Sequence, residues 1–244
     1  MVPGLYSAAA GIRVAEMNHD VLTQNLANID TPGYRRAMAV FETTSLSGPG
    51  DSFGRSFPVV NVNGGENFHN FEAGNSIHTG RDLDVALEGD GFMVVDGPYG
   101  PLYTRNGVFH LTGTGDLVTS SGMAVQGETG AITLPPNTTS SEVTIQRDGT
   151  FVANGIPFGK LRVVRFDNVN ELRAEGPTLF SAPGEPEGDP DTQVYQGYRE
   201  SSNVSATDEL VRMIVGMRQH EAAQRSLQSI SEALRQNIGI QGGQ

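Results

Sequence analysis

The sequence predicts an α+β fold in which long N- and C-terminal helices form a coiled-coil-like pair around a central all-β domain of short strands. Three observations support this fold. Apolar residues recur at alternating steps of three and four near the N-terminus, and the same spacing recurs near the C-terminus. Between them, short apolar runs are separated by glycine, and the 244 residues include 31 glycines and 13 prolines.

The N-terminal helix is predicted over residues 6–29. Apolar spacing sustained over more than three heptads is typical of a helix that packs along another helix. One row holds Leu5, Ile12 and Leu26, with His19 at its weak position, and the other holds Ala8, Ala15, Leu22 and Ile29. Pro32 stops the helix, because proline cannot continue the hydrogen-bond ladder and the residue before it leaves the α region.

The C-terminal helix is predicted to begin after Ser205. Ser205 and Asp208 have the spacing of a capping box, and Asp208 and Glu209 place negative charge at the helix N-terminus. The second 3-4 row then follows as Met213, Gly216, His220, Ala223, Leu227, Ile230 and Leu234. The tail after Ile240 is expected to fray.

The middle of the chain reads as strands and turns. Residues 143–147 and 150–153 flank Asp148-Gly149, which is a hairpin signal. The linker between residues 43 and 75 is rich in glycine, serine and asparagine, so it is expected to be mobile or extended. Its part from residue 48 to residue 72 is short. Four segments result: an N-terminal polymerisation helix and turn (1–42), an extended flexible linker (43–80), a central β domain (81–190), and a C-terminal polymerisation helix and tail (191–244).

The two helices are expected to order fully only on assembly. About seven row residues per helix, several of them alanine or glycine, bury apolar surface worth about 10 kcal/mol. Ordering about 25–30 backbone positions costs roughly 1–2 kcal/mol each, and isolated helices of this length are marginal. Packing against several other copies of the chain would bury more than one face of each helix.

Composition excludes several classes of function. A net charge of −12 disfavours nucleic acid, which needs a cationic face. No apolar run is long enough for membrane insertion, and the first residues do not form a cleavable signal. There are no cysteines, and no catalytic, cofactor-binding or metal-binding motif is found, so we expect no enzyme activity and no cofactor.

Two pairs of side chains leave alternatives open. His19 and His220 share row positions and could meet across the helices, where a metal or pH role competes with the simpler interpretation of partly buried polar residues. Asp82 and Asp84 would face one side of a strand, and solvated charges are the favoured interpretation.

Four motifs resemble one protein family. They are residues 25–34 (NLANIDTPGY), residues 83–92 (LDVALEGDGF), residues 103–109 (YTRNGVF) followed by 115–119 and Gly122, and residues 196–204 (QGYRESSNV) with Met213-Ile214. In this order, and over most of the chain, they resemble the signatures of the flagellar basal-body rod and hook proteins.

The resemblance implies a structural subunit of the flagellar rod, the drive shaft, needed for motility. It implies export from the cytoplasm by the flagellar type III apparatus without a cleaved signal, and helical polymerisation in the periplasm through the terminal helices. The expected partners are copies of the chain itself, other flagellar rod and hook axial proteins, and the export apparatus. The short linker favours a proximal rod member, with a distal rod or hook-type member next.

The candidate polymerisation interface combines the helix rows with three asparagines, for which local capping is the simpler alternative to contacts between subunits. Its residues are Leu5, Ile12, Ala15, Leu22, Asn25, Leu26, Asn28, Ile29, Asn203, Met213, Gly216, Ala223, Leu227, Ile230 and Leu234. The rival function from another class is a secreted oligomeric β-domain binding module, which the absence of tryptophan and of an aromatic platform disfavours.

Overall fold

A computed structural model describes residues 2–40, 42–46, 57–61, 68–136, 138–189 and 191–241. Within these ranges, the side chains of residues 2–8, 42–46, 57–61, 233–234 and 236–241 are not described. The chain divides into two compact units. The first comprises Met1–Ala27, Ala37–Phe68 and Ser205–Gln244, and the second comprises Asn28–Arg36 and His69–Val204.

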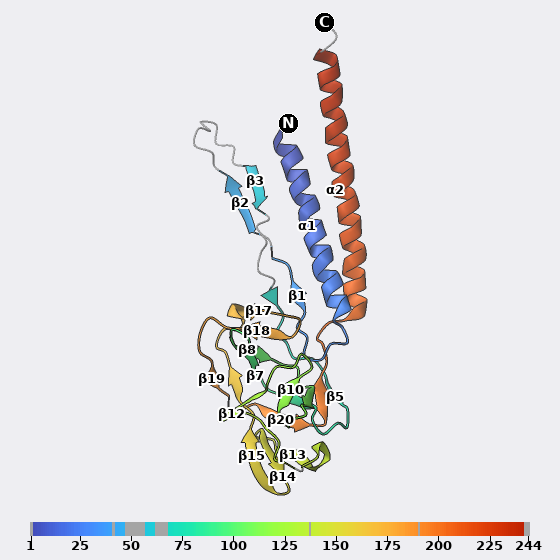
Figure 1. Ribbon diagram of the computed structural model, residues 1–244. Helices are drawn as coiled ribbons and strands as arrows, with labels where there is room; N and C mark the ends of the chain where they lie inside the picture. Colours follow the sequence, from blue (N-terminus) through green and yellow to red (C-terminus); the bar gives the residue numbers. More distant parts are fainter. Residues whose placement is uncertain are drawn as a thin grey trace. The chain divides into compact units, whose positions relative to one another are not determined.

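The predicted fold class, with two long terminal helices in a coiled-coil-like pair, is wrong. The described residues form two α-helices, and the N-terminal one is short: α1 spans Val2–Ala27 (26 residues), whereas α2 spans Ala206–Gln241 (36 residues) (Figure 1). The rest of the chain is a large β-rich central region. The heptad pattern misled because its rows rely on alanine, glycine and histidine, which provide little of the apolar bulk that a coiled-coil seam requires.

Both helices belong to the first unit and lie against each other near Leu22 and Gly216. A Cβ atom added at Gly216 would lie 3.9 Å from Leu22 Cδ1. The same unit contains β1 (Ala37–Met38) and an antiparallel hairpin of β2 (Glu42–Leu46) and β3 (Phe57–Asn61). The hairpin lies in the segment predicted as an extended linker, whose flexibility stays a prediction.

The second unit is built around a six-stranded antiparallel sheet. Its strand order is β17 (Arg173–Ala174), β18 (Leu179–Ser181), β8 (Gly100–Thr104), β7 (Phe92–Gly97), β16 (Val163–Arg165) and β19 (Glu187–Gly188). A three-stranded sheet holds β13 (Val143–Ile145), β14 (Thr150–Ala153) and β15 (Ile156–Lys160). The predicted hairpin through Asp148-Gly149 is confirmed, since β13 pairs antiparallel with β14.

Smaller pieces complete the second unit. Three antiparallel pairs join β6 (Val85–Glu88) to β20 (Gln193–Gln196), β5 (Ser76–His78) to β21 (Tyr198–Glu200), and β9 (Phe109–Leu111) to β10 (Leu117–Thr119). The remaining elements of this unit are β11 (Gln126–Gly127), β12 (Gly130–Ala131) and two 3₁₀ turns, Ser140–Glu142 and Val169–Glu171. The short strand β4 (Phe68–His69) has Phe68 in the first unit and His69 in the second.

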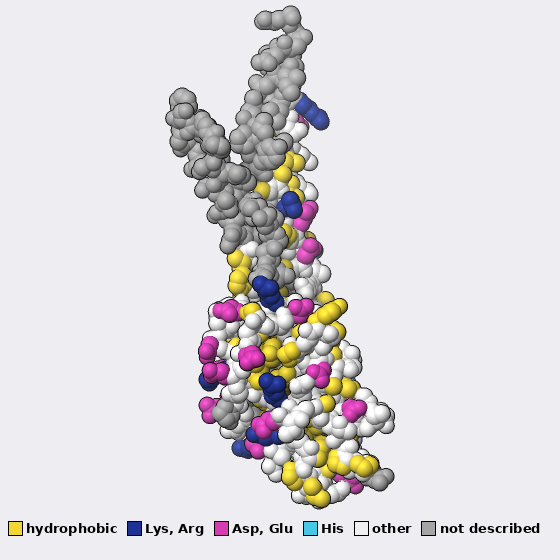
Figure 2. Space-filling model, turned by 60° about the vertical axis from the view of Figure 1, so that its left-hand side comes forward, with side chains coloured by type: hydrophobic (Ala, Val, Ile, Leu, Met, Phe, Trp, Pro, Cys, Tyr) yellow, Lys and Arg dark blue, Asp and Glu magenta, His cyan; other side chains and the backbone are white. Residues whose placement is uncertain are grey.

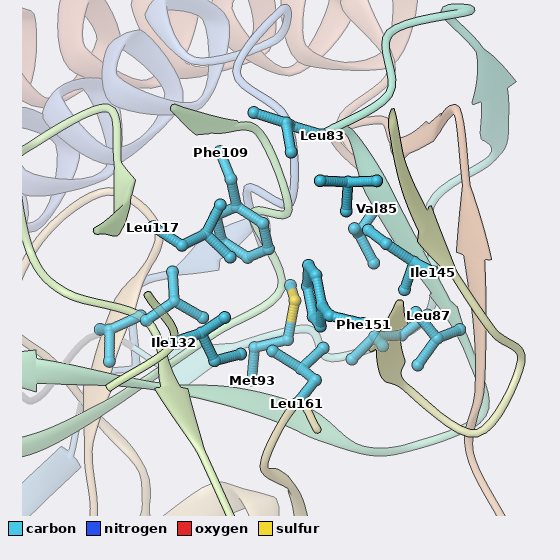
Figure 3. Close-up of a cluster of buried hydrophobic side chains, with 14 residues drawn as sticks. Leu83, Val85, Leu87, Met93, Phe109, Leu117, Ile132, Ile145, Phe151 and Leu161 are labelled. Atoms are coloured by element: carbon cyan, nitrogen blue, oxygen red, sulfur yellow. The ribbon is translucent and has the colours of Figure 1, made fainter. Parts of the chain in front are cut away.

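Two hydrophobic clusters lie on opposite faces of β7. Met93 points into the larger cluster, together with Phe109, Phe151 and Leu161 (Figure 3), and Val95 belongs to the same cluster. Phe92 and Val94 point into the smaller cluster, where Phe180 is fully buried. Alternate residues of a strand face opposite sides of its sheet, so a strand buried on both faces needs an unbroken apolar run. That is why residues 92–95 read Phe-Met-Val-Val.

Candidate functional site

The described helix-row residues of the candidate interface are only half-buried. The half-buried members are Ile12, Ala15, Leu22, Leu26, Met213, Gly216, Ala223, Leu227 and Ile230. Leu5 and Leu234 lie within the helices, but their side chains are outside the described residues. Half-burial within one chain leaves apolar surface that further packing could remove from water.

The first half of α2 also exposes large apolar side chains. Leu210, Val211, Ile214, Val215 and Met217 are between 46% and 56% exposed. Figure 2 shows hydrophobic atoms along this helix, interspersed with charged side chains. A soluble monomer rarely keeps such a set uncovered, so this stretch of α2 has the character of an interaction surface.

Asn25, by contrast, serves the chain itself. It is fully buried; its Nδ2 donates to the carbonyl of Ala37 (2.9 Å) and its Oδ1 accepts from the Ala37 amide (2.8 Å). This pair of bonds fixes the last turn of α1 to β1. The bonds of Asn25 within this chain therefore agree with the local role that was the alternative to a contact between subunits. A further contact of Asn25 with another subunit stays a prediction.

Asn28 and Ile29 lie beyond α1 rather than within it. The helix ends at Ala27, and the Thr31 amide donates to the Asn28 carbonyl (3.1 Å) in the turn that follows. Thr31 Oγ1 also donates to Asn28 Oδ1 (3.3 Å). This turn places both residues outside the helix that was predicted over residues 6–29, and it removes Ile29 from its predicted row.

Asn203 joins three segments of the second unit. Its Oδ1 accepts from the Arg36 amide (2.7 Å), and its Nδ2 donates to the carbonyls of Asn70 (2.8 Å) and Glu72 (2.9 Å). The segment that follows α1 and the segment that precedes α2 are therefore held together by one amide side chain. The Gly33 amide adds a bond to the Glu200 carbonyl (2.9 Å).

The same two segments share a buried ionic cluster. Arg35 Nη2 donates to Glu200 Oε1 (2.7 Å), Arg105 Nη1 lies 3.6 Å from Glu200 Oε2, and all three side chains are at most 3% exposed. The Gly74 amide also donates to Glu200 Oε1 (2.9 Å). One carboxylate thus faces two arginines, so the cluster depends on Glu200 for its balance of charge.

Burial lowers the pKa of two basic side chains in and beside this cluster, Arg105 and His69. It lowers the pKa of Arg105 to about 10, against the opposing effect of the Glu200 carboxylate. Arg105 also lies over the Phe92 ring, 5.2 Å from its centroid. Burial likewise lowers the pKa of His69, although the hydrogen bond between its Nδ1 and the Arg35 carbonyl (3.1 Å) acts in the opposite direction.

The sequence reasoning missed this cluster and one buried acid. Arg35 and Glu200 are 165 residues apart, so no local spacing connects them. Asp84 was predicted to be solvated, which is wrong: it is 2% exposed, accepts from Thr79 Oγ1 (2.7 Å) and lies 3.3 Å from Arg81. One feature of the sequence could have pointed to the cluster: Arg105 and Glu200 both lie within the motifs that resemble the family, residues 103–109 and 196–204.

His19 and His220 line one groove between α1 and α2. Among the described residues, no group of three or more histidine and acidic side chains is placed to hold a metal ion. No described helix is long and apolar enough to cross a membrane.

Two family descriptions match the chain. "Flagellar hook protein FlgE/F/G D1 domain" matches residues 86–153, which include β6 to β14, and "Flagellar basal body rod FlgEFG protein C-terminal" matches residues 195–238, which include most of α2. The two matches cover part of the β-rich region and the exposed apolar part of α2 described above.

Similar proteins match over nearly the whole chain. The flagellar basal-body rod protein FlgG of Buchnera aphidicola is 33% identical over 261 residues, covering 96% of this chain and 98% of the relative. FlgF of Rhizobium meliloti is 31% identical over 253 residues, covering 100% and 99%. FlgG of Bacillus subtilis is 30% identical over 271 residues, covering 98% and 99%. This chain therefore belongs to the flagellar basal-body rod protein family.

Proposed function

We propose that copies of this chain polymerise into the rod through α1 and α2. Its β-rich region holds together the segment that follows α1 and the segment that precedes α2. That the chain is a structural subunit of the flagellar basal-body rod follows from its family. The observation that carries the polymerisation proposal is the exposed apolar set on α2, which lies inside the matched C-terminal region. The candidate residues on both helices, from Leu5 to Leu234, remain the proposed contacts.

The rest of the proposal concerns binding, assembly partners, export and position. We infer that the chain has no catalytic role, binds neither nucleic acid nor membrane, and assembles with other rod and hook axial proteins. A net charge of −12 opposes binding to phosphate backbones. We further propose export by the flagellar type III apparatus without a cleaved signal, and a final position in the periplasmic part of the rod.

Alignment lengths favour a FlgF-type, proximal member. The FlgF relatives of Rhizobium meliloti and Caulobacter vibrioides align over 253 and 222 residues while covering 100% and 90% of this chain, so few gaps are needed. The FlgG relatives of Buchnera and Bacillus need 261 and 271 aligned positions for 96% and 98% of it. The FlgG relatives thus carry insertions that this chain lacks.

Deletion of the gene tests the proposal. We expect non-motile cells whose purified basal bodies, imaged by electron microscopy, stop within the rod and carry no hook. A rod truncated close to its base supports the proximal position, whereas a nearly full-length rod supports a distal one. Motile cells with intact flagella would overturn the rod function itself.

A further inference from the structure

A groove between α1 and α2 has the chemistry to receive a cationic, apolar segment. Its volume is about 390 Å³. Small or apolar residues, Ala15, Gly216 and Met217, line it together with the carboxylates of Glu16, Asp20 and Glu221. Gly216 contributes no side chain, so the groove stays open beside Leu22.

The charges in this groove are incompletely paired within one chain. Glu221 lies 3.3 Å from Arg225, but that pair is exposed and weak. Glu16 and Asp20 make no ion pair with any described residue. The groove therefore presents two exposed carboxylates that attract a positive charge from outside the chain.

A neighbouring face of α2 carries the complementary chemistry. Val211, Ile214, Val215 and Arg218 follow one another at helical spacing and form what we call the apolar stripe. The three apolar residues are 56%, 48% and 47% exposed, and Arg218 is exposed as well. Arg218 is two residues from Gly216, so at 3.6 residues per turn it points about 200° away from it.

We propose that the apolar stripe of one copy of the chain docks into the α1/α2 groove of another copy, with Arg218 pairing with Glu16 and Asp20. This inference rests on the proposed polymerisation through the helices, and it specifies which surfaces of two copies meet. Two copies repel overall because each carries a net charge of −12. Contact between copies therefore favours a site where a locally positive face meets a locally negative one.

The placement of the two surfaces predicts how assembly propagates. Groove and stripe are different surfaces on neighbouring faces of the same helix, so their pairing is heterologous. Heterologous contacts that do not close into a ring generate open helical filaments. The same contact can then repeat along a rod without any two-fold symmetric dimer.

Cysteine cross-linking tests this contact without background, because the chain contains no cysteine. The full-length double variant Ala15→Cys/Val215→Cys, oxidised in isolated basal bodies, is expected to give a ladder at multiples of 26.0 kDa. The matched control Ala15→Cys/Gln228→Cys should give none, because the exposed Gln228 lies 13 residues from Val215, about 20 Å along α2. Products that stop at a dimer, or that contain another axial protein, would overturn the proposal.

Charge reversal gives an independent test. Rescue by the double variant distinguishes a lost ion pair from a folding defect in either single variant. Arg218→Glu and Asp20→Arg are each expected to reduce the number of assembled rods at least about tenfold, and Arg218→Glu/Asp20→Arg should restore them. Arg212→Glu, with the same charge change off the stripe, should assemble like the wild type. Normal rods in Arg218→Glu cells would refute the docking while leaving the rod function intact, provided that the deletion strain is non-motile.

Discussion

At the scale of single residues, the buried Glu200 connects segments of the second unit that are far apart in the chain. It receives Arg35 and the Gly74 amide on one oxygen and faces Arg105 with the other. Buried donors remain on both arginines, since Nε and Nη1 of each have no hydrogen-bond partner within the described structure. Because Glu200 is the carboxylate that contacts both arginines, the cluster is sensitive to its loss.

Glu200→Gln is therefore expected to destabilise the second unit by about 3 kcal/mol or more, since it removes the carboxylate that contacts two buried guanidinium groups. Urea unfolding followed by tyrosine fluorescence measures the change, because Tyr34, Tyr99, Tyr103, Tyr195 and Tyr198 all lie in this unit. Glu128→Gln, which removes the exposed ion pair with Lys160 (2.8 Å), is the control and should cost at most about 1 kcal/mol. Equal effects would contradict the importance of the buried cluster.

Gly33 is constrained by its backbone and by its surroundings. Its φ is +69°, and a Cβ atom there would lie 2.5 Å from the Arg105 carbonyl carbon. Gly33→Ala should therefore cost clearly more than the roughly 1–2 kcal/mol of left-handed strain alone. Gly155→Ala isolates that strain, because Gly155 has φ +79° and open space around it. If thermal unfolding shows similar losses for both variants, the close approach to Arg105 is unimportant.

His69 is expected to make stability depend on pH. Burial lowers its pKa below 6.5 in the folded state, so the unfolded chain binds more protons between the two pKa values. Stability is therefore complete above pH 6.5 and decreases as the pH falls, by at most about 1.4 kcal/mol per pH unit. Relative to His69→Gln, the wild type should lose unfolding free energy between pH 7.5 and 5.5. Parallel pH curves for the two proteins would exclude His69 as the cause.

At the scale of helices and strands, the sequence predicted those features that depend on neighbouring residues. Ser205 does precede α2, and its Oγ accepts from the Asp208 amide (3.4 Å). The turn at Gly149, with φ +83°, joins β13 to β14 as the Asp-Gly pair indicated. The cluster at Glu200 and the bonds of Asn203 were not predictable in this way, because they join segments that are far apart in the chain.

The heptad rows show the converse error. Their spacing predicted two long helices in a coiled-coil-like pair, yet the buried apolar residue of α1 among those described is Val21, which lies outside both rows. Spacing identifies one face of a helix, but it does not fix what covers that face or how long the helix is. The spacing therefore did not predict that apolar residues such as Val215 are exposed on α2.

A substitution at Gly216 tests how much this glycine lowers the stability of α2. Gly216→Ala should stabilise the helix by about 1 kcal/mol, because alanine is the better helix former and its Cβ would meet Leu22 at an ordinary 3.9 Å. Circular dichroism during thermal unfolding measures the gain. Gly11→Ala in α1, where no atom lies within 4 Å, should act similarly. A loss at Gly216 but not at Gly11 would indicate that the helices pack more tightly there than the structure shows.

At the scale of the whole molecule, folding and assembly use different residues. The second unit has its own two hydrophobic clusters and the buried charges at Glu200. The helices instead keep half-buried and exposed apolar residues, such as Leu227 and Ile214. It follows that a substitution on α2 can block assembly without unfolding the β-rich unit.

Leu227→Asp is the sharpest test of that separation. A carboxylate at this half-buried position costs several kcal/mol wherever assembly removes it from water, so we expect rods to be lost and cells to be non-motile. Tyrosine fluorescence should show unchanged unfolding of the second unit, because Leu227 lies outside it. Gln228→Asp adds the same charge at the exposed neighbouring position and should leave motility intact. Motile Leu227→Asp cells would remove this part of α2 from the interface, whereas a destabilised β-rich unit would show that folding and assembly are coupled.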